Sequence, residues 1–134
     1  MSLQPEGAQV VDEHLFHFVA SLEVKKAPRL QYPLAIMTLR SASVESVEPM
    51  ARRLSSAVRS SDLVGLNPSG PGVRLLLIDV GPEELEPIIR RVNEMLADLS
   101  PVGFGAACLP TTGTSLEELL TQADTQARAH RSSG

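Results

Sequence analysis

Arg59 and Asp62 are the two residues whose types and spacing are best suited to binding a ligand. They open and close the tetrapeptide RSSD, which follows the expected end of a helix and precedes an apolar stretch. An arginine fork can donate two parallel hydrogen bonds to a phosphate, and a carboxylate can accept hydrogen bonds from N–H groups. An Arg and an Asp at such a junction are also commonly a surface ion pair or a cap, worth about 0–1 kcal/mol. The sequence leaves both roles open.

The turn that follows, residues 67–72, reads NPSGPG and is poor in reactive groups. It has no acid, no base and no nucleophile stronger than Ser69. Two of its residues, Pro68 and Pro71, lack the backbone N–H donors that a phosphate-binding loop needs. Two prolines and two glycines are typical of a tight turn, so the segment is predicted to connect two strands without doing chemistry.

Composition limits the classes of protein that fit. A chain of 134 residues suits one domain, here expected over residues 10–131, with a flexible lead over 1–9 and a frayed tail over 132–134. The net charge of -4 argues against a nucleic-acid binder, which normally carries a basic surplus. No apolar run reaches the roughly 18–20 residues of a membrane span, and no signal pattern opens the chain, so a cytoplasmic location is expected.

Metal binding is not expected from the residue types available. One cysteine, Cys108, excludes a cysteine-rich site and fits a small core residue better than a reactive thiol. His14 and His17 are spaced three apart on a predicted helix and could share a metal, but no third ligand accompanies them.

Hydrophobic periodicity predicts a mixed α/β chain, with the element order α-β-α-β-β-α-β-α. The central βαββαβ is the ferredoxin-like pattern, an α+β fold in which helices cover one face of a four-stranded antiparallel sheet and the first and third strands are central. Helices flank this core at both ends of the chain. The expected elements are helices over 10–26, 43–58, 81–99 and from 116 onward, and strands over 34–39, 62–66, 73–80 and 102–109.

The first predicted helix has an apolar face at Val11, Leu15, Phe18 and Leu22. Their gaps of four, three and four residues are those of one helical side, so this face is expected to pack on the core. Pro28 is expected to end the helix.

This arrangement resembles the GGDEF family, the diguanylate cyclases that make cyclic di-GMP from two GTP on a nucleotidyl-cyclase-like palm. The resemblance covers roughly residues 11–134. The family has Arg-x-x-Asp, five residues, then the Gly-Gly-Asp/Glu-Glu-Phe signature and an apolar strand. In this chain the same spacing leads from Arg59 and Asp62 to a signature slot occupied by Pro68, Ser69, Gly70, Pro71 and Gly72.

The C-terminal half supports the same resemblance. Residues 102–107, VGFGAA, are similar to the family's SIGVA strand, and residues 116–124, LEELLTQAD, are similar to its LLxxAD helix. After this helix only the spacing and a final glycine match the family.

The departures from the family predict that the chain is not an enzyme. The resemblance implies catalysis by Mg²⁺ held on carboxylates, one of them at the end of the first strand. No Asp or Glu occurs between Glu23 and Glu45, Arg40 stands at that strand end, and Gly70 and Pro71 replace the signature acids. A family helix that grips GTP also has no room before Arg59. No catalytic residue, Mg²⁺ or other cofactor is therefore expected.

The resemblance also implies a candidate ligand, because Arg-x-x-Asp is similar to the family's inhibitory site for cyclic di-GMP. Arginine can bond guanine O6 and N7, and a carboxylate can accept from guanine N1 and N2. The family completes this site with an arginine on the helix after the hairpin. When the family spacing is counted from Arg59 without a gap, this arginine falls on Arg90, with Arg91 adjacent. The hypothesis is a non-catalytic regulatory domain that binds cyclic di-GMP. The alternative is a nucleotide-independent module for binding a protein partner or for dimerisation in bacterial signalling.

Overall fold

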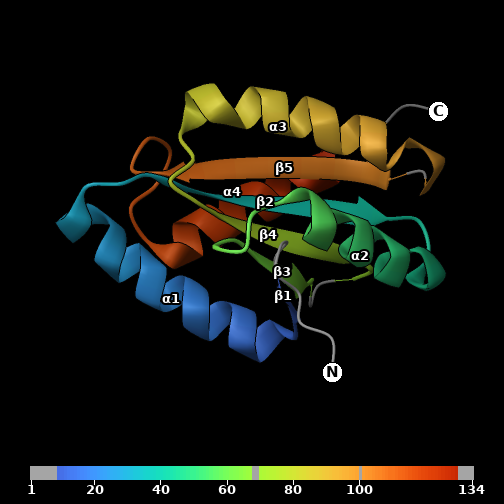
Figure 1. Cartoon of the computed structure of the whole chain (residues 1–134), viewed down its shortest axis with the longest axis horizontal. Helices are drawn as coiled ribbons and strands as arrows, with labels where there is room; N and C mark the ends of the chain where they lie inside the picture. The colour runs from blue at the N-terminus through green and yellow to red at the C-terminus, as the bar shows by residue number, and fades with distance from the viewer. Residues whose placement is uncertain (1–8, 68–69, 100, 130–134) are drawn as a thin grey trace.

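The computed structural model describes residues 9–67, 70–99 and 101–129, which form one sheet with helices on both sides (Figure 1). The strands are β1 (Gln9–Val11), β2 (Leu34–Ser41), β3 (Leu63–Leu66), β4 (Gly72–Ile78) and β5 (Pro101–Leu109). The helices are α1 (Glu13–Leu30), α2 (Val47–Ala57), α3 (Pro82–Met95) and α4 (Leu116–Ala129), with short 3-10 turns η1 (Val44–Ser46) and η2 (Ala97–Leu99). Within these ranges no helix is both long and apolar enough to cross a membrane.

The sheet has the order β1-β3-β4-β2-β5. Pairs β3–β4, β4–β2 and β2–β5 are antiparallel, as the ferredoxin-like pattern predicts, and its two most apolar strands, β2 and β4, are central. The sequence did not predict β1, which pairs in parallel with the edge of β3. Because this strand has only three residues, it shows no periodicity, and its pairing comes from backbone contacts rather than from a side-chain pattern.

Two hydrophobic cores lie on the two faces of the sheet, because alternate residues of a strand point to opposite sides. On one face, Met37 and Leu39 of β2 pack with the buried sides of α2 and α3. On the other face, Leu34 and Ile36 pack with α1 and α4. The helices of the βαββαβ core therefore cover one face as predicted, and the flanking helices cover the second (Figure 1).

The predicted core face of the first helix is wrong at three of its four residues; Val11 packs against the core but lies in β1. Residues Leu15, Phe18 and Leu22 are 46%, 61% and 50% exposed. The buried side of α1 is instead lined by Phe16, Ala20, Val24 and Ala27. Both sets are spaced as one helical face, and the side with two alanines packs on the sheet, where small residues allow a close approach.

Both ends of α1 also differ from the prediction. The helix begins at Glu13, where Asp12 acts as the N-cap by accepting a hydrogen bond from the Leu15 amide at 2.9 Å. It continues past Pro28 to Leu30; Pro28 has no N–H to donate to the Val24 carbonyl, and the helix ends two residues later. Gln31, in the left-handed conformation, closes this end on the Ala27 carbonyl.

Gly105 of β5 lies very close to the backbone of α4. A Cβ placed on this residue of β5 would lie 2.1 Å from the Ala123 carbonyl oxygen of α4. Helix α4 therefore packs directly on the backbone of β5, and the absence of a side chain at position 105 permits this.

Candidate functional site

The Asp62 carboxylate is buried and is bonded to the protein's own backbone. Its side chain is 3% exposed. It accepts hydrogen bonds from the Arg59 amide at 3.0 Å and from the Ile78 amide at 2.9 Å. Asp62 thus joins the turn after α2 to the end of β4.

Arg59 keeps its guanidinium near this carboxylate while leaving most of it in solvent. Its Nε lies 3.6 Å from an Asp62 oxygen, and its side chain is 58% exposed. A terminal nitrogen of the same group also donates to the Ile78 carbonyl. The ion pair and this hydrogen bond hold the guanidinium in one place.

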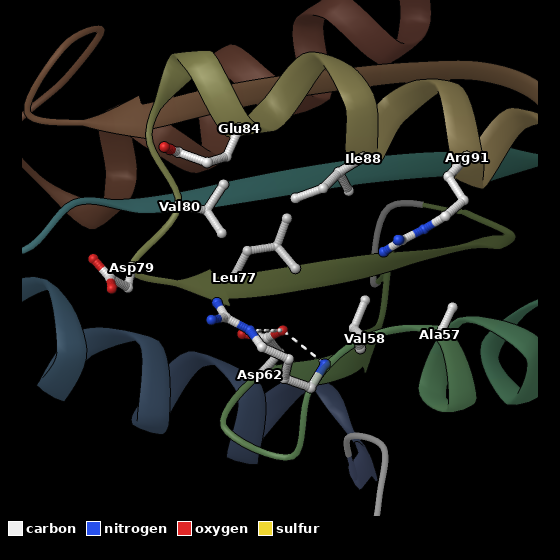
Figure 2. Close-up of a pocket in the computed structure, with 10 residues that line it drawn as sticks. Ala57, Val58, Asp62, Leu77, Asp79, Val80, Glu84, Ile88 and Arg91 are labelled. Atoms are coloured by element: carbon white, nitrogen blue, oxygen red, sulfur yellow. Dashed lines mark hydrogen bonds and ion pairs between the residues drawn. The ribbon is translucent and has the colours of Figure 1, made fainter.

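Arg59 and Asp62 line a pocket of about 240 Å³ between the end of α2, strand β4 and helix α3 (Figure 2). We call it the α2–α3 pocket. Arg91 reaches it from α3, whereas the neighbouring Arg90 does not line it. The rotation of α3 thus brings the second of the two predicted arginines to the pocket, together with Arg59 and Asp62. The full lining is Ala57, Val58, Arg59, Asp62, Leu77, Asp79, Val80, Glu84, Ile88 and Arg91.

The pocket carries charges of both signs. Figure 2 shows Arg91 at one end and Asp79 and Glu84 at the other. Glu84 caps the start of α3, where its carboxylate accepts a hydrogen bond from the Gly81 amide at 2.7 Å. The sequence analysis did not single out Asp79 and Glu84, which both line the pocket. The Arg59 guanidinium bonds the Ile78 carbonyl, next to Asp79, so an anionic ligand would be favoured at the Arg91 end of the pocket.

The opposite end of β4 meets the end of β2, where the resemblance would place a metal. Among the described residues, a small hollow there is lined by Thr38, Arg40, Asn67, Gly70, Pro71, Asp124 and Arg128. Its one carboxylate, Asp124, forms an ion pair with Arg74 and accepts a hydrogen bond from the Thr38 hydroxyl at 2.7 Å. The hollow thus combines two arginines with one acid that already has two partners, whereas Mg²⁺ is usually bound through carboxylate oxygens.

Sequence reasoning did not find the Arg74–Asp124 pair. Arg74 is 7% exposed and comes from β4, and Asp124 comes from α4. The Nε of Arg74 has no hydrogen-bond partner within the described part of the chain. The available signal was one arginine in an otherwise apolar strand, which indicates a buried partner elsewhere.

The signature slot is only partly described, because Pro68 and Ser69 lie outside the described residues. Gly70 has a φ of 146°, which favours glycine. The carbonyl of Pro71 accepts a hydrogen bond from the Ser41 amide at 2.9 Å, and Gly72 pairs with Arg40 in the sheet. These residues join the hairpin to the end of β2 and present no acid there.

No cluster of three or more metal-binding side chains occurs in the part of the chain that is described. His14 and His17 are both exposed on α1. Cys108 is a buried core residue, as predicted, and burial raises the pKa of its thiol, with a further contribution from the charge of Glu84. A raised pKa keeps the thiol protonated and therefore a poor nucleophile.

No protein-family model and no curated protein matches this sequence. Several solved structures share its fold. The GGDEF domain of YfiN (TpbB) from Pseudomonas aeruginosa is 20% identical with a TM-score of 0.77, over 92% of this chain and 93% of that one. A sensory box/GGDEF family protein from Caulobacter crescentus is 18% identical with a TM-score of 0.76, over 92% and 94%. The diguanylate cyclase SiaD from Pseudomonas aeruginosa, in complex with its activator SiaC, is 17% identical with a TM-score of 0.73, over 90% and 56%. The chain therefore has the fold of GGDEF domains.

Proposed function

We propose that this chain is a non-catalytic GGDEF-like regulatory domain that binds cyclic di-GMP at the α2–α3 pocket. One observation carries the proposal: Arg59 and Arg91, from different elements, both line one pocket beside Asp62. Guanidinium groups can bond guanine O6 and N7 or a phosphate in a bidentate manner. Because the Asp62 carboxylate is already bonded to two amides, its main contribution is to fix the position of Arg59.

The pocket volume limits how such a ligand would bind. About 240 Å³ is below the roughly 300–1,000 Å³ of sites that enclose a drug-sized ligand. A cyclic dinucleotide would therefore lie across the opening, with one base or phosphate between Arg59 and Arg91. Arg90, on the next position of α3, would contribute little in this arrangement.

The absence of catalysis is supported by the hollow between β2 and β4. Arg40 and Arg128 line it, and their charge would repel Mg²⁺. Its acid, Asp124, is held by Arg74 and Thr38. We expect the purified domain to form no cyclic di-GMP from GTP and Mg²⁺. Product detected above a no-protein control would contradict this part of the proposal.

Binding is tested by isothermal titration calorimetry with cyclic di-GMP. We expect Arg59→Ala and Arg91→Ala each to raise the Kd about tenfold or more, because one well-formed bidentate contact to guanine contributes about 1–3 kcal/mol. Arg90→Ala is the matched control, since it removes an exposed arginine from the adjacent position and should leave the Kd within about twofold. No heat from the unaltered protein at high ligand concentration would exclude the site.

A second candidate function is a nucleotide-independent interaction module. Specific support comes from the three large apolar side chains on the outside of α1, Leu15, Phe18 and Leu22. A protein partner is also consistent with the SiaD structure, which contains an activator protein. Concentration-dependent self-association with no effect of nucleotide would favour this function over the first.

A further inference from the structure

Helix α1 presents an apolar stripe on the side opposite its buried one. Leu15, Phe18 and Leu22 are 46%, 61% and 50% exposed, and we call them the outward face of α1. With 3.6 residues per turn, they lie about half a turn away from the buried Phe16 and Ala20. Figure 1 shows α1 along the border of the molecule. Large apolar residues gathered on one exposed face, rather than scattered, indicate an interaction surface.

Opposite charges lie at the two ends of this stripe. Asp12 and Glu13 are exposed at the start of α1, whereas Lys25, Lys26 and Arg29 are exposed toward its end. Lys26 also pairs with Glu23 at 3.2 Å, and its side chain remains 54% exposed. The outward face therefore has an acidic end, an apolar middle and a basic end.

We propose that the outward face of α1 binds a second copy of this chain, with the two α1 helices antiparallel. This orientation places the acidic end of each helix beside the basic end of the other, whereas a parallel pair would place like charges together. Leu15 and Leu22 lie at equal distances from a midpoint next to Phe18. A two-fold axis there sets Leu15 against Leu22 of the partner subunit and brings the two Phe18 rings together.

A negatively charged membrane is a poorer occupant of the same surface. Helices that lie on such membranes usually combine an apolar face with a strongly basic polar face. Here the three basic residues of α1 are accompanied by Glu13 and Glu23, with Asp12 just before the helix. The whole chain also has a net charge of -4, which disfavours approach to anionic lipid.

The size of the surface predicts a weak dimer. An 18-residue helix is about 27 Å long, so a contact along one side buries well under the roughly 800 Å² per partner of a standard stable interface. We therefore expect a dissociation constant of about 10 μM or weaker, and a dimer fraction that rises with protein concentration.

Sedimentation velocity over a series of protein concentrations tests the surface. Phe18→Glu should raise the dimer dissociation constant about tenfold or more, because it places two charges at the centre of the contact. Val44→Glu is the control, since Val44 is 74% exposed on η1 and lies outside the outward face. A monomer at every concentration, or equal loss of dimer in both variants, would overturn the proposal.

Orientation is tested by disulfide cross-linking between two variants, His14→Cys and Lys25→Cys. An antiparallel pair predicts a heterodimeric cross-link when the variants are mixed, and little cross-linking of either alone. Cross-links within each variant alone would overturn this orientation. A third experiment measures flotation of the protein with phosphatidylserine vesicles. If a monomeric protein bound the vesicles, the outward face of α1 would be a lipid-binding surface instead.

This inference rests on the second candidate function and is independent of nucleotide binding. Phe18 lies on α1, which does not line the α2–α3 pocket, so Phe18→Glu should leave the Kd for cyclic di-GMP unchanged. Conversely, Arg91→Ala should leave self-association unchanged. Failure of one proposal can therefore be separated from failure of the other.

Discussion

Replacing Asp62 should destabilise the fold far more than replacing Arg59, although the two residues form one ion pair. Asp62→Ala leaves the amides of Arg59 and Ile78 without their acceptor at a buried position. A buried donor that loses its partner costs about 1–3 kcal/mol, so the two together predict a loss of about 2–6 kcal/mol. Arg59 is 58% exposed, and its removal should cost about 0–1 kcal/mol.

Urea denaturation of the two variants beside the unaltered protein measures this difference. With a slope of about 2 kcal/mol per molar urea, Asp62→Ala should lower the midpoint by about 1–3 M and Arg59→Ala by less than about 0.5 M. Equal losses for both variants, or a loss below about 0.5 kcal/mol for Asp62→Ala, would refute the role assigned to the carboxylate. The result also determines which variant is suitable for ligand binding, because a protein that unfolds cannot report on the pocket.

Three further perturbations test other parts of the structure. Asp124→Ala should cost about 3–5 kcal/mol in urea denaturation, because it leaves the buried charge of Arg74 unpaired; a change below about 1 kcal/mol would contradict the pair. Gly105→Ala should lower the melting temperature strongly, since its methyl group would lie 2.1 Å from a carbonyl oxygen of α4, and a melting temperature equal to that of the unaltered protein would contradict that packing. Burial, together with the hydrogen bond to Glu23, raises the pKa of Tyr32 from 10.0 to about 12. The folded state therefore favours the protonated phenol, and this contribution is complete below pH 10 and is lost as the pH rises through 12. Tyr32→Phe should remove that part of the pH dependence when urea midpoints are compared between pH 9 and 12, and identical profiles would contradict it.

The sequence predicted the sheet well because the two central strands have a clear hydrophobic pattern. Strands β2 and β4 are apolar on both faces, and the order of elements around them leaves the ferredoxin-like pattern as the simplest topology. The outward face of α1 shows the limit of periodicity. Helix α1 has two stripes at helical spacing, and the one with the larger side chains remained outside because the alanine-containing side fits closer to the sheet. The spacing of the apolar residues Leu15, Phe18 and Leu22 had predicted the opposite.

In the candidate site, contacts between residues close in sequence could be predicted, whereas contacts between distant elements could not. Arg59 and Asp62 are three residues apart, so their pairing followed from spacing. Whether Arg90 or Arg91 lines the pocket depends on the rotation of α3, which counting along the chain does not supply. The pair of Arg74 with Asp124 joins elements fifty residues apart, and no local pattern connects them.

A thermal-shift titration with cyclic di-GMP, with GTP plus Mg²⁺ in parallel, tests the proposed function most directly. At a ligand concentration about 100 times the Kd, binding to the folded state adds about 2.7 kcal/mol of stability, which such a scan resolves. We predict a rise in melting temperature with cyclic di-GMP, a smaller rise in Arg91→Ala than in Arg90→Ala, and no product from GTP. An unchanged melting temperature with cyclic di-GMP, or turnover of GTP, would contradict the assignment of this domain as a non-catalytic receptor.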